Sequence, residues 1–210
     1  MLTLFDYGPS ANCLKVRILL RQLGIEHERV DVDIFAGESQ RADYLELNPA
    51  GRTPALLLDD GRAIAESNAI LLYLAEGSRF LPTDPVDRAH VHQWLFFEQN
   101  LLEPNAGSAR FWHLTGRESQ QPGAFAQRLQ AGKDALTILD RGLAGHEFLV
   151  EDRYGVADVA LYAYTHVAHE AGIDMSAYRT IAPWLERVET TDGFVNDLEP
   201  YPANAQVSAD

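Results

Sequence analysis

The stretch Tyr7-Gly8-Pro9-Ser10-Ala11-Asn12-Cys13-Leu14-Lys15-Val16 reads as a turn that opens a helix, and the rest of the chain is organised around it. The preceding segment 2–5 predicts a short strand, and Gly24 predicts the end of the helix. Between them, apolar residues recur at the helical period, at Val16, Leu19, Leu20 and Leu23. Ser10 and Asn12 therefore lie at a helix start, where backbone N–H groups bind anions, thiolates included; alternatively, they simply cap the helix.

Composition limits the class of protein. The chain has 210 residues, 46% of them hydrophobic, which is enough for one or two domains with real cores. We find neither a secretory signal nor an apolar run long enough to span a membrane. Cys13 is the sole cysteine, so an internal disulfide and a cysteine metal cluster are excluded. These features predict a cytoplasmic protein.

Charge disfavours nucleic acid as a partner. With 31 acidic and 17 basic residues, the net charge is −14, and most of the surface would repel a phosphate backbone. Solubility explains this acidity, which is compatible with a local basic pocket for a small anion. The histidines lack metal-ligand spacing, since His90 and His92 would point to different sides of a helix. We therefore expect no metal, no nucleic acid and no membrane partner.

The first half of the chain predicts a small α/β domain. After the first strand and helix we expect a half-buried strand over 27–34, a short helix ending at 44–47, a strand over 52–58, a returning strand over 62–65 and a helix opening at 66–68. The last helix carries an apolar stripe of Ile70, Tyr73 and Leu74. The order β-α-β-α-β-β-α, complete near Gly77, predicts a mixed sheet.

The second half predicts helices alone. Residues 78–85 have the composition of a linker, which divides the chain into a domain over 1–77 and a helical domain over 86–210. The helices are marked by Val91, Trp94, Leu95 and Leu102, by Leu129, Leu136, Leu139 and Leu143, by the apolar run after Gly155, and by Pro183-Trp184-Leu185. The polar stretch 200–210 is expected to fray.

Four ordered motifs carry a resemblance to a known family. They are Ser10-x-Asn12-Cys13-x-Lys15-Val16, Asn48-Pro49-x-Gly51-Arg52-x-Pro54-Ala55-Leu56, Glu66-Ser67-Asn68-Ala69-Ile70 with Tyr73-Leu74, and Ala157-Asp158-Val159-Ala160-Leu161. Together they resemble the glutathione S-transferase superfamily, in particular its bacterial, serine-type members. The resemblance implies a thioredoxin-like, glutathione-binding N-terminal domain joined to an all-α C-terminal bundle. It also implies a homodimer.

The resemblance gives residues of the first half roles toward glutathione. Ser67, with its backbone N–H at a helix start, suits the γ-glutamyl carboxylate, and Glu66 suits the ammonium group. Pro54 is expected to be cis, which would expose the Thr53 backbone to the cysteinyl backbone. Arg52 is expected to meet the glycine carboxylate. Gln40 is a weaker candidate for that end.

Each of these roles has a simpler alternative. Glu66 and Ser67 can be an ordinary helix start, Arg52 a solvated loop charge, and Pro54 a trans residue at a strand entrance.

The chemical step implied is attack of the glutathione thiolate on an electrophilic carbon. We rank Ser10 first as the donor that stabilises the sulfur anion, Asn12 second and Tyr7 third. The pattern at this helix start is Ser-x-x-Cys, so a dithiol redox cycle is unavailable, and Cys13 is expected to be a packed small residue.

The resemblance extends into the helical half. The small electrophile is expected against the long helix after the linker, where the candidate lining residues, besides Tyr7, are Asn105, Ser108, Phe111 and Trp112. These residues serve equally well as interhelical packing. Asp158 resembles the family's capping residue. Because Gly155 stands where the family has Ser or Thr, only the carboxylate-to-backbone half of that capping box can form.

Three functions follow in order of preference. The first is a glutathione transferase acting on a small electrophile, with glutathione as co-substrate. The second is a glutathione-dependent disulfide reductase, which would not need Cys13. The third is a non-catalytic scaffold that binds glutathione or another ligand.

Overall fold

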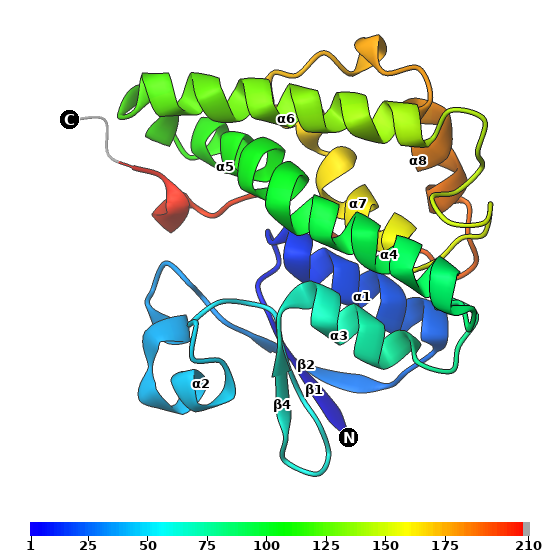
Figure 1. Ribbon diagram of the computed structural model, residues 1–210. Coiled ribbons are helices and arrows are strands. Elements are labelled where there is room, and N and C mark those ends of the chain that lie inside the picture. Colours follow the sequence, from blue (N-terminus) through cyan, green and yellow to red (C-terminus); the bar gives the residue numbers. More distant parts are fainter. Residues whose placement is uncertain (208–210) are drawn as a thin grey trace. The chain divides into compact units, whose positions relative to one another are not determined.

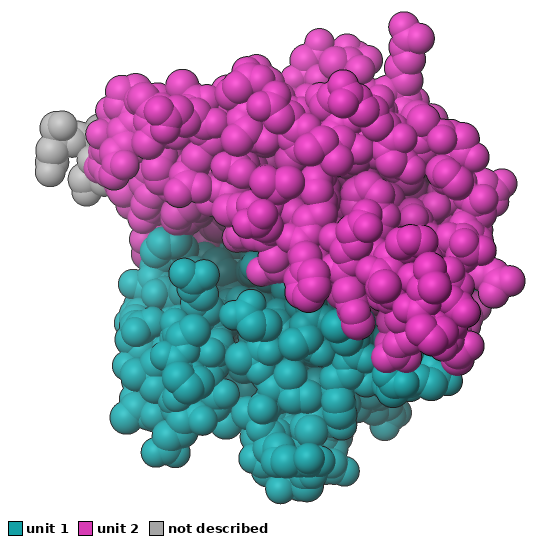
Figure 2. All heavy atoms as spheres, in the orientation of Figure 1, with its two compact units in different colours: residues 1–78, 192–200 teal, residues 79–191, 201–210 magenta. Residues whose placement is uncertain are grey.

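The computed structural model describes residues 1–207, which form two compact units (Figure 1). Unit 1 consists of Met1–Ser78 and Asp192–Pro200. Unit 2 consists of Arg79–Thr191 and of the described residues from Tyr201 onward. Figure 2 gives each unit its own colour. The chain thus returns to unit 1 over 192–200, a segment that the predicted division at residues 77 and 86 places in the helical half.

Unit 1 is built on a four-stranded mixed sheet in the order β2-β1-β3-β4. The strands are β1 Leu2–Asp6, β2 His27–Asp31, β3 Ala55–Leu57 and β4 Ala63–Ala65. β1 runs parallel to β2 and antiparallel to β3, and β3 and β4 form an antiparallel hairpin. With helices α1 Ala11–Leu23, α2 Ala42–Leu47 and α3 Ser67–Ala75, the element order confirms the predicted β-α-β-α-β-β-α domain.

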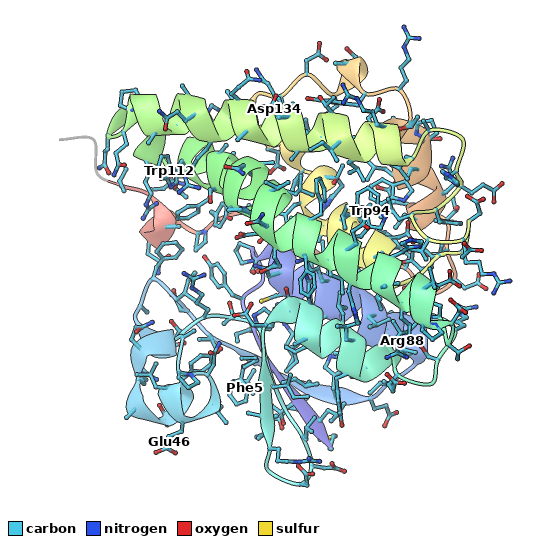
Figure 3. The ribbon with its side chains drawn as sticks, in the orientation of Figure 1. Phe5, Glu46, Arg88, Trp94, Trp112 and Asp134 are labelled. Atoms are coloured by element: carbon cyan, nitrogen blue, oxygen red, sulfur yellow. The ribbon has the colours of Figure 1, made fainter. Side chains whose placement is uncertain are left out.

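Helix α1 begins and ends where the sequence predicts. Ser10 caps α1, and Gly24 ends it in the left-handed conformation with φ of 65°. α1 and α3 pack against each other (Figure 1). α2 packs through Tyr44 on Phe5, edge to face with ring centroids 5.8 Å apart; Phe5 is labelled in Figure 3.

Three expectations for unit 1 are wrong in detail. The strand expected over 52–58 is limited to Ala55–Leu57, because the Arg52 carbonyl bonds to the Tyr44 and Asn48 side chains and the Thr53–Pro54 bond is cis. The strand expected over 27–34 ends at Asp31, because the Asp33 carboxylate accepts the N–H groups of Phe35 and Ala36 and so starts a turn. Tyr73 is 47% exposed and does not belong to the buried stripe of α3. Leu71 is fully buried there, beside Ile70 and Leu74.

Unit 2 is helical, as predicted. Its helices are α4 Pro85–Phe97, the π-helical segment η2 Glu98–Gly107, α5 Ser108–Leu114, α6 Pro122–Gly142, α7 Val156–Thr165 and α8 Ile181–Glu189. The first three follow without a break, so the predicted long helix continues through Pro104 in wider turns. Short 3₁₀ turns lie at Arg117–Ser119, Ala168–Ala171, Met175–Ala177 and Ala203–Ala205.

The core of unit 2 is centred on α7, whose ten residues are all buried. At its start the Gly155 N–H donates to the Asp158 carboxylate at 3.1 Å, which confirms the predicted half of the capping box. Glycine has no side chain to supply the other half.

The end of the chain is not frayed through residue 207, which corrects the expectation for 200–210. The Val207 N–H donates to the Thr115 carbonyl at 3.1 Å, Arg117 Nη1 donates to the Ala205 carbonyl at 2.6 Å, and Ala205 is fully buried. The backbone of this segment thus bonds to other parts of unit 2. Residues 208–210 lie outside the described part of the chain.

Candidate functional site

The turn before α1 holds Ser10 at the helix N-terminus. Its backbone is extended, with φ of −81° and ψ of 119°, and its N–H donates to the Tyr7 carbonyl at 2.8 Å. Ser10 Oγ accepts the Cys13 N–H at 3.3 Å, so this side chain does cap the helix. A hydroxyl that accepts in this way still has its own hydrogen to donate. The capping role and a role toward an anion are therefore compatible.

Cys13 is fully buried, which confirms its predicted packing role. The Tyr7 N–H points at its sulfur at 3.4 Å. Burial raises the pKa of the thiol to about 12, and the charge of Asp6 adds to that shift. At neutral pH this side chain stays a thiol, so any sulfur nucleophile must come from a bound ligand.

The starts of α1 and α3 are joined by a buried hydrogen-bond cluster. Ser67 Oγ donates to Asn12 Oδ1 at 3.0 Å, and Lys15 Nζ donates to Ser67 Oγ and to Asn68 Oδ1, each at 3.3 Å. Lys15 is fully buried, and Ser67 is 4% exposed. Two motifs that lie far apart in sequence, one predicted for a sulfur anion and one for a carboxylate, thus become neighbours.

Lys15 is the residue that the sequence reasoning missed. The motif includes it, but no role was predicted for it. The available signal is its position: Lys15 lies one turn before Leu19, on the apolar side of a helix where a lysine would otherwise not be buried. A cation in that place needs polar partners, and Ser67 and Asn68 supply them.

Glu66 precedes α3 in a backbone conformation that residues other than glycine seldom adopt, with φ of 68° and ψ of 116°. Its carbonyl accepts the Ile70 N–H at 3.0 Å, and its side chain is exposed. Strained backbone of this kind concentrates at functional sites, and Glu66 directly precedes Ser67 of the cluster.

The loop before β3 lies in the same unit. The Thr53–Pro54 peptide bond is cis, as predicted. The Arg52 carbonyl accepts from Tyr44 Oη and from Asn48 Nδ2, both at 2.7 Å, while the Arg52 side chain is exposed. Gln40 Nε2 donates to the Gly51 carbonyl at 3.0 Å. These bonds hold the loop in place and leave the Arg52 guanidinium directed to solvent.

The residues predicted to line an electrophile pocket lie on η2 and α5. Asn105 Nδ2 donates to the Leu101 carbonyl of its own helix at 2.8 Å, and Ser108 is the first residue of α5. The Arg128 guanidinium lies over the Trp112 ring, 5.2 Å from its centroid; Trp112 is labelled in Figure 3. The Phe111 ring packs edge to face on Tyr201 at 5.4 Å. Both aromatic rings therefore have packing partners, and all four residues are partly exposed.

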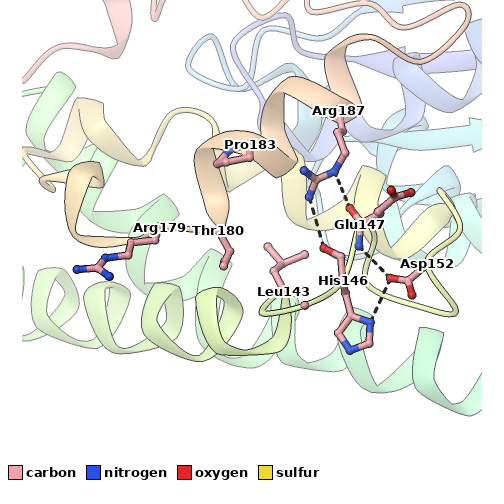
Figure 4. A pocket seen from close by; sticks show the side chains of 9 residues that line it. Leu143, His146, Glu147, Asp152, Arg179, Thr180, Pro183 and Arg187 are labelled. Carbon is pink, nitrogen blue, oxygen red and sulfur yellow. Dashed lines mark hydrogen bonds and ion pairs between the residues drawn. The ribbon is translucent and has the colours of Figure 1, made fainter.

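A separate hollow of about 480 Å³ opens in unit 2 (Figure 4). It is lined by Leu143, Gly145, His146, Glu147, Asp152, Arg179, Thr180, Pro183 and Arg187. Its polar groups bond to one another. Arg187 donates to the carbonyls of His146 and Glu147, and the Asp152 carboxylate accepts a hydrogen bond from the Glu147 N–H. Arg179 points away from these groups (Figure 4). The hollow thus lacks converging polar groups for a ligand.

Two general properties complete the description. Among residues 1–207, no group of three or more His, Cys, Asp or Glu side chains is arranged to hold a metal ion. No helix within this range is both long and apolar enough to cross a bilayer.

Comparison with known proteins gives one consistent answer. Residues 9–76 match the family model described as glutathione S-transferase, N-terminal domain. The solved structure of a glutathione S-transferase from Pseudomonas fluorescens [Pf-5] is similar with a TM-score of 0.92 and 40% identity, over 94% of this chain and 99% of that one.

Two further relatives bear on the chemistry. A glutathione transferase from Pseudomonas putida, solved with one glutathione disulfide bound per subunit, is similar with a TM-score of 0.81 and 26% identity, over 91% of this chain and 88% of that one. The disulfide-bond oxidoreductase YfcG of Escherichia coli (strain K12) is 28% identical over 192 residues, which are 88% of each chain.

Proposed function

This chain belongs to the glutathione S-transferase superfamily, and we propose that it binds glutathione and activates its thiol for attack on a small electrophile. The observation that carries the proposal is the 3.0 Å hydrogen bond from Ser67 to Asn12, which joins the starts of α3 and α1. One tripeptide can then place its γ-glutamyl end at α3 and its sulfur at α1. The proposal therefore assigns one ligand to both helix starts.

At the sulfur end, we infer that Ser10 donates its hydroxyl hydrogen to the thiolate. The first-turn N–H groups of α1 also favour the anion, and together they lower the pKa of the bound thiol. The thiol proton passes to solvent. A sulfur lone pair then forms the carbon–sulfur bond, and the leaving group departs with the electron pair of the bond that breaks.

Asn12 and Tyr7 rank below Ser10 for physical reasons. Asn12 Oδ1 already accepts from Ser67, which leaves its amide N–H₂ as the group able to face the sulfur. Tyr7 is only 7% exposed, and its ring packs on Phe35. A hydroxyl on a buried ring is a poorer donor to an incoming ligand than Ser10, which is partly exposed.

At the γ-glutamyl end, we infer that the Ser67 N–H donates to the carboxylate and that Glu66 accepts from the ammonium group. Lys15 lies beneath them and orients the Ser67 hydroxyl toward Asn12, so it supports both ends of the tripeptide. The Thr53 backbone beside Pro54 is proposed for the cysteinyl backbone. Arg52, with Gln40 as the weaker candidate, is proposed for the glycine carboxylate; the Arg52 guanidinium is exposed, as that contact requires.

The test is a titration of bound glutathione, followed by ultraviolet absorbance of its thiolate, together with turnover of a model aryl halide. Wild-type protein should lower the thiol pKa below that of free glutathione. Ser10→Ala should reduce kcat by roughly ten- to a hundredfold with little change in glutathione affinity, because a donor to the developing anion is lost. Unchanged kcat in Ser10→Ala, together with an inactive Asn12→Ala, would reverse our ranking of the two donors.

A second candidate function is glutathione-dependent disulfide reduction. It is favoured by the relative that is a disulfide-bond oxidoreductase and by the one solved with glutathione disulfide. Two glutathione thiols would be oxidised to glutathione disulfide while the substrate disulfide gains two electrons and two protons. Mass spectrometry of the products separates this reaction from conjugation. A non-catalytic scaffold would bind glutathione without lowering its thiol pKa.

We further propose a cytoplasmic homodimer. The apolar side chains predicted for the helix over 91–102 fall into two groups. One group is buried and comprises Val91, Leu95 and Leu102. The other is exposed, with Phe96 at 71% and Leu101 at 38%. A second copy of the chain would cover these two side chains. For the electrophile, Asn105, Ser108, Phe111 and Trp112 remain the proposed lining.

A further inference from the structure

The segment Asp192–Pro200 returns to unit 1 and meets the turn that precedes Ser10. The Glu199 N–H donates to the Gly8 carbonyl at 3.2 Å. Arg17 Nη2 donates to the same carbonyl, also at 3.2 Å. One carbonyl of the turn is therefore held by two donors, one from α1 and one from the far end of the sequence.

Arg17 connects this contact to buried charge. It is 5% exposed, and it pairs with Asp6 at 2.8 Å and with Asp197 at 2.7 Å. Asp6 is fully buried at the end of β1, so its carboxylate depends on such partners. The guanidinium thus ties β1, the Gly8 carbonyl and the returning segment into one network.

Arg29 extends the network from β2. Its guanidinium lies 2.5 Å from the second oxygen of Asp6 and 3.4 Å from Glu199. Asp31, which is 82% exposed, also pairs with Arg29 at 3.3 Å, whereas the Gly8 carbonyl accepts from Glu199 and Arg17. Asp31 therefore offers a matched control, because its removal takes a carboxylate from the same arginine and leaves the contacts of Gly8 in place.

Gly8 fits this arrangement because it has no side chain. A Cβ added there would lie 2.3 Å from Glu199 Cδ and 2.4 Å from Glu199 Oε2. The Glu199 carboxylate thus lies directly on the Gly8 backbone. Since the obstructing group is the end of a side chain, an alanine at this position would displace Glu199.

We propose that Asp197 and Glu199 are positioning residues that clamp the Tyr7–Ser10 turn and so aim Ser10 at the thiolate. The turn is short and internally bonded, with the Ser10 N–H on the Tyr7 carbonyl at 2.8 Å, so a shift at Gly8 moves Ser10. The inference rests on the proposed function. It adds that thiol activation by the N-terminal unit depends on residues near the C-terminus.

The first experiment compares Asp197→Ala/Glu199→Ala with wild type and with Asp31→Ala. The double variant keeps the Glu199 N–H but removes the carboxylates that Asp197 and Glu199 place on Arg17 and Arg29. It should raise the pKa of the bound thiol and lower kcat by about tenfold, with KM for glutathione nearly unchanged, because Ser10 is misplaced and not removed. Asp31→Ala should match wild type. Equal loss in Asp31→Ala, or wild-type values in the double variant, would overturn the clamp.

A double-mutant cycle gives an independent answer. Gly8→Ala should lower kcat by about tenfold in the wild-type background. In the Glu199→Ala background the same substitution should lower kcat clearly less, because the Glu199 carboxylate no longer occupies the space of the added Cβ. Equal costs in both backgrounds would contradict the contact. Gly123→Ala, where an added Cβ meets nothing within 4 Å, is the control for the substitution itself.

The two proposals fail in different ways. Wild-type protein that does not lower the pKa of the glutathione thiol overturns the proposed function. Wild-type protein that lowers it, together with a double variant that lowers it equally, overturns the clamp alone.

Discussion

Removing the Asp158 carboxylate should destabilise unit 2 more than removing the exposed aspartate cap Asp174. Asp158 is fully buried. Its Oδ1 accepts Trp184 Nε1–H at 2.9 Å and the Leu149 N–H at 3.1 Å, and its Oδ2 accepts the Gly155 N–H at 3.1 Å. Asp158→Ala would therefore leave three donors without their acceptor.

The expected loss follows from these three bonds. A buried donor left unsatisfied costs roughly 1–3 kcal/mol. Burial also raises the pKa of Asp158 to about 6, so the wild-type carboxylate carries a desolvation penalty that offsets part of the gain. We therefore expect Asp158→Ala to lower the free energy of unfolding by about 3 kcal/mol, at the low end for three donors. Asp158→Asn should lose less, because its amide oxygen can retain the two bonds made by Oδ1.

Urea unfolding followed by tryptophan fluorescence measures this loss. The three tryptophans, Trp94, Trp112 and Trp184, all lie in unit 2, so the signal reports on that unit. The control is Asp174→Ala, an exposed aspartate that accepts the Ser176 N–H at 3.0 Å and should cost less than about 1 kcal/mol. A loss in Asp158→Ala no larger than in Asp174→Ala would refute the reasoning.

Four further predictions use other observations. Because the Asp158 pKa is raised to about 6, its contribution to stability should be largest below pH 4 and fall as pH rises through 6; the gap between wild type and Asp158→Ala, measured by urea unfolding, should shrink over that range. Iodoacetamide should leave Cys13 unmodified in the folded protein and label it in urea, as read by mass spectrometry, because the buried thiol has its pKa raised to about 12. Lys15→Met should raise KM for glutathione by about tenfold, since a charged donor to Ser67 is lost, and unchanged kinetics would contradict its role. Phe96→Lys should convert the proposed dimer to a monomer in light scattering, whereas Val86→Lys, also at an exposed position, should not.

The sequence predicted elements whose signals are local. Ser10 and Gly24 bound α1 because a cap and a left-handed glycine act within one helical turn. The end of β2 was predicted three residues too late, because apolar alternation continues past Asp31 while the Asp33 side chain already bonds the next turn. Periodicity shows which residues are apolar, but it does not show which backbone N–H groups a side chain such as Asp33 will hydrogen-bond.

The errors share a cause, which is contact between distant segments. Tyr73 fits the helical period and is nevertheless exposed, since period alone does not decide which face of a short, almost wholly apolar helix is covered. The polar segment 200–210 was expected to fray, but up to residue 207 its backbone bonds to Thr115 and Arg117. Polar composition predicts disorder only where no partner is available elsewhere in the fold.

The same distinction applies to the candidate site. Ser10, Glu66 and Ser67 were predicted because adjacent residues mark a helix start and the family resemblance assigns roles to those residues. Lys15 and Glu199 were not, because their relevance depends on which helix start they reach. A helix N-terminus attracts anions weakly when exposed, and its effect on a thiol depends on how firmly the donors are held. Residues that set this firmness can come from any part of the chain, so a search for the determinants of reactivity in this family member should extend from α1 to the returning segment 192–200.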